Sequence, residues 1–164
     1  MGRFGGCKFD DLKKFQEKLN KLNTNEINTF IEACAKELAA RLLAKVIKRT
    51  PVGEYPKSSG KKGGTLRRGW TTQASGSGSE GGKPRGASQY VETLKVNHFG
   101  DTYVIEIVNP IDYASYVEFG HRTRNHEGWV RGRFMLTISE QELEAAAPGI
   151  LERKLVKKLG ECFK

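Results

Sequence analysis

The side chains best suited to proton transfer near neutral pH are the three histidines, His98, His121 and His126. A histidine-dependent nuclease would need two imidazoles, or an imidazole and a carboxylate, held across a cleft. His121 and His126 share one segment, but no cysteine or carboxylate cluster accompanies them, so the spacing indicates neither a catalytic pair nor a zinc site. The sequence also lacks a phosphate-binding P-loop, a G-x-S-x-G and an H-E-x-x-H pattern. We therefore expect no enzymatic activity, no metal and no cofactor.

Aromatic residues next to basic ones are the second feature with chemical potential, because such pairs can stack on nucleic-acid bases. Trp70 follows Arg67 and Arg68, and Trp129 precedes Arg131. Trp70 also lies in a segment that we interpret as the start of a strand, so we assign it to the core. Trp129 lies in a polar segment, where contact with a protein partner and contact with DNA are equally compatible with the pattern.

A third cluster, Tyr113, Tyr116 and Phe119, surrounds one carboxylate, Glu118. We expect the three rings to pack in the core or at a subunit interface rather than to form a binding cage. Glu118 is expected to form an ion pair with the arginines that follow it, Arg122 and Arg124, and so to hold that basic segment in place.

Positive charge is concentrated in two parts of the chain. The formal net charge is +9, and the segment from Lys45 to Arg85 contains ten basic residues against two acidic ones. A second basic segment contains Arg122, Arg124, Arg131 and Arg133, opposed only by Glu127. Such segments are either solvated loops that maintain solubility or surfaces that face phosphate or an acidic partner.

Composition limits the class of protein. The chain has 164 residues, of which 37% are hydrophobic, and this suits one domain with additional arms. No apolar run approaches the roughly 20 residues of a membrane span, and the first residues match neither a secretory nor a myristoylation signal. The three cysteines are far apart, which favours a reducing compartment over a disulfide scaffold.

Hydrophobic periodicity predicts the elements of the first half. A short amphipathic helix is expected at about residues 10–22, and a helix of about 25 residues should follow and end before Thr50-Pro51. Residues 51–64 and 75–88 are rich in glycine, serine and proline and are expected to be flexible loops, with the start of a strand at 65–72. Residues 90–97 and 102–108 are expected to form a hairpin around Gly100.

The second half is expected to be mainly helical. Asp112 should cap a short helix at residues 113–119, and Gly120 should end it in a left-handed conformation. Residues 121–133 are expected to form a basic flexible loop. Ser139 and Glu142 have the spacing of a capping box, which predicts that the last helix begins near Ser139, and Pro148 should kink it.

Together these elements predict an α+β fold. Three or four antiparallel strands would pack on the long N-terminal helix, and a kinked C-terminal helix and long flexible loops would complete the fold. Residues 1–23 are expected to form a helical arm, and residues 24–164 a single domain.

Three stretches of the sequence, taken in order, are similar to a known family. They are Thr50-Pro51-Val52 followed by Gly64 to Trp70, then Tyr113 to Arg122, then Arg133 to Leu136. In this order after a long helix, they resemble the neck or tail-component proteins of long-tailed bacteriophages, whose middle pattern is Y-A-x-Y-V-E-F-G-T-R. The chain departs from the family in the expanded turn at 53–64, in Arg133 where proline is usual and in Thr137 where alanine is usual.

The resemblance implies a structural virion protein of the head–tail junction, assembled in the cytoplasm of the bacterial host. Its partners would be further copies of itself in a homo-oligomeric ring, a head-side connector, and a tail terminator or tail tube protein, with non-specific contact to genomic DNA in the lumen and none with membrane. The alternatives are a tail terminator or tail-completion ring, and a basic nucleic-acid-binding protein that acts alone.

Two sets of site residues follow for such a ring. The first set, expected at a subunit or partner interface, consists of Tyr113, Tyr116, Glu118, Phe119, Arg122, Trp129 and Phe134. The second set, expected on basic loops that face the lumen or DNA, consists of Lys57, Lys61, Lys62, Arg67, Arg68, Lys83 and Arg85.

Overall fold

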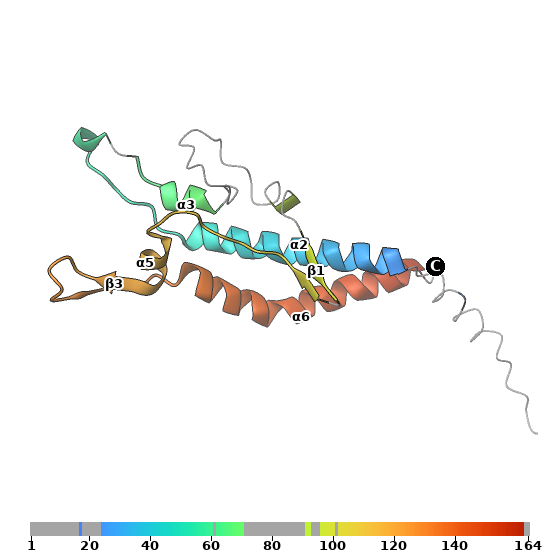
Figure 1. The fold of residues 1–164 in the computed structure, drawn as a ribbon. Coiled ribbons are helices and arrows are strands. Elements are labelled where there is room, and N and C mark those ends of the chain that lie inside the picture. The colour runs from blue at the N-terminus through green and yellow to red at the C-terminus, as the bar shows by residue number, and fades with distance from the viewer. Residues whose placement is uncertain are drawn as a thin grey trace, which may run out of the picture.

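Two long helices form the body of the protein. The computed structural model describes residues 17, 24–60, 62–70, 91–92, 96–100 and 102–162. Helices α2 (Thr24–Arg49) and α6 (Met135–Cys162) lie side by side and run in opposite directions (Figure 1). The expected arm at residues 1–23, apart from Glu17, and the expected loop at 75–88 lie outside the described residues. The fold is α+β, as the sequence predicts.

Helix α2 confirms the long helix predicted from the apolar stripe. It ends at Arg49, directly before Thr50-Pro51, and Lys48 and Arg49 occupy its last turn, where the helix dipole favours cations. The helix contributes Ala39, Leu43 and Val46 to the core, and the last two are fully buried.

The predicted strand at residues 65–72 is wrong in the part that the structure describes, because Thr65–Gly69 form helix α3. Gly64 adopts a φ of 91°, and its carbonyl accepts a hydrogen bond from the Arg68 amide at 3.0 Å, which closes the first helical turn. Trp70 is 4% exposed and is part of the core, as expected, although it follows a helix and not a strand. The core cluster consists of Ala39, Leu43, Val46, Leu66, Trp70, Val91 and Met135.

In the part of the chain that the structure describes, the strands form two separate hairpins and not one sheet of three or four strands. In the first, β1 (Asn97–Phe99) pairs with β2 (Thr102–Val104), and Gly100 adopts a positive φ in the turn. This confirms the predicted hairpin in a shorter form, since Val91 and Glu92 are helical. Ile105 and Ile107 follow β2 and pack against the core.

The second hairpin replaces the loop predicted at residues 121–133. Strand β3 (Gly120–Arg122) pairs with β4 (Trp129–Arg131) in an antiparallel register. It follows α5 (Ala114–Phe119) directly. The predicted cap at Asp112 is wrong, because Tyr113 precedes the first turn of α5 and no side chain caps it. Gly120 has the expected positive φ of 89°, but its ψ of 172° is extended and starts β3.

Helix α6 begins at Met135, one turn earlier than the predicted capping box at Ser139. Ser139 is instead fully buried inside the helix, and its hydroxyl donates to the Met135 carbonyl oxygen at 2.6 Å. The helix continues through Pro148 to Cys162 and bends near its middle (Figure 1), as a proline within a helix requires.

Candidate interaction surface at the joined helix ends

The best-defined polar site joins α5 to the start of α6 through Glu118. This side chain is only 6% exposed. Its Oε2 accepts a hydrogen bond from the Leu136 amide at 3.0 Å, and its Oε1 accepts from the Thr137 amide at 2.9 Å and the Thr137 hydroxyl at 2.8 Å. The carboxylate therefore caps α6, where free amides and the helix dipole favour a negative charge. The expected ion pair of Glu118 with Arg122 and Arg124 is wrong.

Backbone contacts strengthen the same joint. The Arg133 amide donates to the Val117 carbonyl oxygen at 2.8 Å, and the Phe134 amide donates to the Glu118 carbonyl oxygen at 3.0 Å. Phe134 is half-buried and adopts a left-handed φ of 50°. A Cβ atom on Gly132 would lie 2.3 Å from the Glu118 carbonyl oxygen, so the second hairpin leaves no space between itself and α5.

A second joint forms around Thr50, at the C-terminal end of α2. The Thr50 hydroxyl donates to the Val46 carbonyl oxygen at 2.7 Å and accepts a hydrogen bond from the Trp70 indole nitrogen at 2.8 Å. The Thr50 carbonyl oxygen accepts from Nε and Nη2 of Arg67 at 3.1 and 2.6 Å. The first of the three family stretches is thus a single hydrogen-bonded unit, in which a buried threonine connects α2 to α3.

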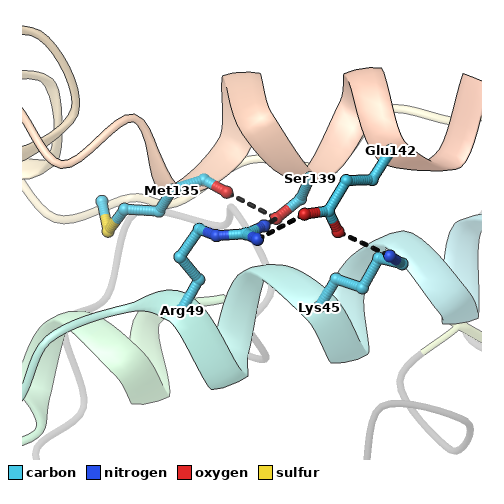
Figure 2. Close-up of polar contacts among 5 residues, drawn as sticks. All are labelled: Lys45, Arg49, Met135, Ser139 and Glu142. Carbon is cyan, nitrogen blue, oxygen red and sulfur yellow. Dashed lines mark hydrogen bonds and ion pairs between the residues drawn. The ribbon is translucent and has the colours of Figure 1, made fainter.

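A third joint connects α2 with α6 (Figure 2). Arg49 donates through Nη1 to the Ser139 hydroxyl at 2.8 Å and through Nη2 to Oε1 of Glu142 at 2.6 Å. Lys45 donates to Oε2 of Glu142, also at 2.6 Å. The hydrogen bonds from Lys45 and then Arg49 lower the pKa of Glu142 below its ordinary value of 4.5. Lys45 and Arg49 therefore bind Glu142, the glutamate that the sequence pattern predicts in a capping box.

Near the middle of α2, Glu37 forms ion pairs with Arg41 of its own helix and with Lys154 of α6. The hydrogen bonds from Lys154 and then Arg41 lower the pKa of Glu37. The two long helices are therefore fastened by ion pairs at two well-separated positions.

Aromatic side chains point outward from the joined end. Tyr113, Tyr116, Phe119 and Trp129 are 45%, 58%, 62% and 62% exposed. Of the residues expected at an interface, these four and the exposed Arg122 lie on the surface, whereas Glu118 is buried. In the β3–β4 register, Arg122 lies directly opposite Trp129, so the two side chains share one face of the hairpin with Arg131.

The residues expected on basic loops have different surroundings. Lys57 begins the short 3-10 helix η1 (Lys57–Ser59), and both it and Lys62 are exposed. Arg67 is committed to the Thr50 joint, and Arg68 donates to the Gly63 carbonyl oxygen at 3.3 Å and to the Thr65 hydroxyl at 3.4 Å. The other members of the set, Lys61, Lys83 and Arg85, lie outside the described residues.

The described residues contain no group of three or more metal-binding side chains. An open depression of about 380 Å³, between Phe30 of α2 and Lys158 of α6, lies at the opposite end from the aromatic surface. None of the helices in the described ranges combines the length and the apolar character that crossing a bilayer demands.

Comparison with protein families matches residues 13–120 to the family described as "Bacteriophage HK97-gp10, putative tail-component". The chain belongs to the HK97-gp10-like family. The match covers more than half of the chain and includes α2, the Thr50 joint, the first hairpin and α5. Neither a curated protein nor a solved structure matches the chain. Membership identifies a structural tail component of a bacteriophage virion.

The HK97-gp10-like match ends at Gly120, whereas the contacts of its last matched helix continue beyond it. Glu118 is inside the match, and its partners Leu136 and Thr137 are outside. Sequence analysis singled out Glu118 and assigned Ser139 and Glu142 to a capping box, but it did not predict that Arg49 binds both, because these partners are 90 or more residues away in the chain. The one local sign of the joint in the sequence was the position of the Glu118 carboxylate between apolar neighbours.

Proposed function

We propose that this HK97-gp10-like protein forms a homo-oligomeric ring at the neck of the phage, between the head connector and the tail, through which DNA passes. Its partners would be the head-side connector and the tail terminator or tail tube protein, and it would assemble in the bacterial cytoplasm. The observation that carries the proposal is the exposed aromatic and arginine surface on an end of the molecule that three joints make rigid. A solvent-exposed apolar surface of this kind is typical of protein interfaces.

The lumen is proposed to be lined in part by the exposed basic residues Lys57 and Lys62, together with Lys61, Lys83 and Arg85. Phosphate contacts of this kind carry no sequence information, so DNA would pass without being read. Arg67 is proposed to act differently, since its guanidinium is already bonded to Thr50.

The location is tested by imaging particles that carry a labelled copy of this chain. Density at the collar is the expected result, and density elsewhere in the particle contradicts the proposal. Reversal of charge in Lys57→Glu/Lys62→Glu should block DNA retention and leave the protein folded, whereas normal infectious particles from this variant would contradict the lumen assignment.

A tail terminator or tail-completion ring is the second candidate, and the same images distinguish it, because its density would lie at the head-proximal end of the tail tube itself. A basic nucleic-acid-binding protein that acts alone is favoured by one observation, the exposed Trp129 beside Arg122 and Arg131. Salt-dependent DNA binding by the purified monomer, without ring formation, would support that candidate.

A further inference from the structure

Two exposed surfaces of this chain carry opposite charges. The first, called here the hairpin surface, contains Arg122, Arg124, Arg131 and Arg133 next to the exposed Phe119 and Trp129. Within the described part of the chain, no ion pair or side-chain hydrogen bond engages any of these four arginines.

The second surface is a stripe along α6. Glu140, Glu144, Leu151 and Leu155 are spaced so that their directions fall within about 60° of one another around the helix axis. All four are exposed, and the leucines are 37% and 49% accessible. The two glutamates form no ion pair with any described residue. We call this set the α6 stripe.

The two surfaces are complementary in chemistry. Each combines exposed apolar side chains, which favour removal from water, with charges that have no ion-pair partner among the described residues. The α6 stripe begins only one turn beyond the residues that Glu118 caps, and no ion pair among the described residues joins it to the arginines of the hairpin surface. One copy can therefore offer its hairpin surface while its α6 stripe remains free.

We propose that the partner of the hairpin surface is the α6 stripe of a second copy of this chain. The two different patches then make a heterologous contact, and repetition of such a contact around an axis closes a ring. This inference rests on the proposed ring, for which it names the contacting surfaces. Double-stranded DNA is the less suitable occupant, because it offers no apolar counterpart to Phe119 and leaves the leucines of α6 uncovered.

Self-association of the full chain, measured by sedimentation over a range of concentrations, tests the pairing. Arg122→Glu/Arg131→Glu should weaken association about tenfold, and Glu140→Arg/Glu144→Arg should weaken it to a similar degree, since each reversal replaces attraction by repulsion. The combination of all four changes should restore association to near the original strength. The control Lys48→Glu/Arg153→Glu changes the net charge as much as the arginine reversal does, at exposed residues outside both surfaces, and should have no effect.

Three results would overturn the pairing. The first is a chain that stays monomeric at every concentration. The second is a reversal variant that associates as strongly as the original protein. The third is a fourfold variant that unfolds at the original temperature, and is therefore folded, but does not regain association. If the arginine reversal abolishes salt-dependent DNA binding, and the fourfold variant regains neither association nor DNA binding, the hairpin surface binds DNA instead. Collar density in imaged particles is independent of these results, so the proposed function can survive the loss of this inference.

Discussion

The carboxylate of Glu118 should contribute strongly to stability, because it is the only side chain that caps α6 among the described residues. Replacement by alanine removes three hydrogen bonds to a charged acceptor and leaves the amides of Leu136 and Thr137 without a side-chain acceptor. Each hydrogen bond to a charged group contributes about 1.5–3 kcal/mol. Both amides belong to half-buried residues, so water replaces part of the loss, and we expect about 3 kcal/mol in total for Glu118→Ala.

The assay is equilibrium unfolding in urea and by heat, followed by circular dichroism. For a chain of this size, about 3 kcal/mol corresponds to a fall in Tm of roughly 6–12 °C. Glu118→Gln keeps the volume and one acceptor oxygen, so it should lose about half as much free energy of unfolding.

Glu140→Ala is the matched control, because Glu140 is an exposed glutamate of the same helix with no partner in the described part of the chain. It should change the free energy of unfolding by less than about 0.5 kcal/mol. A Glu118→Ala protein that is as stable as this control would refute the capping role.

Three further perturbations address the remaining contacts of the joints. Thr50→Val keeps the shape but leaves the buried indole nitrogen of Trp70 without its acceptor, and urea unfolding should show a loss of about 1–3 kcal/mol; an unchanged midpoint contradicts this. Gly132→Ala places a Cβ 2.3 Å from a backbone oxygen and should lower Tm through a loss of about 1–3 kcal/mol, whereas Gly149→Ala, with nothing within 4 Å, should be neutral or stabilising. Because the pKa of Glu142 is lowered in the folded protein, the stability that its charge contributes is present above pH 4.5 and is lost as the pH falls through the folded-state pKa. Below pH 4.5, the Tm of Glu142→Gln should therefore fall less steeply with decreasing pH than the Tm of the original protein. Identical slopes would contradict the lowered pKa.

The sequence was sufficient where a pattern is local. The end of α2 follows from the stereochemistry of Thr50-Pro51, and the first hairpin follows from alternating residues around Gly100. Both signals lie within about ten residues, so neither depends on distant contacts. Helix α3 was missed because Trp70 and the threonines after it have high β-propensity, while the burial that decides the conformation comes from α2 and α6.

The joints could not be predicted, because each depends on a partner that is distant in the chain. Ser139 and Glu142 have the spacing of a capping box, but Glu118 already satisfies the amides at the start of α6 from 18 and 19 residues earlier. Glu142 is thereby released to pair with Lys45 and Arg49. The sequence predicts a loop where the hairpin β3–β4 forms, because the arginines and the histidine of this segment lack the alternation of a half-buried strand.

The separation of Lys45 and Arg49 from Glu142, 97 and 93 residues respectively, has a consequence for synthesis on the ribosome. Bacterial translation adds roughly 5–20 residues per second, so α2 emerges about 5–20 s before the helix that covers it. During this interval Leu43 and Val46, both fully buried in the finished molecule, lack the Met135 side chain that packs in the same cluster. The nascent chain therefore passes through a period in which chaperones, or neighbouring nascent chains, compete with its own C-terminal half for the same apolar residues.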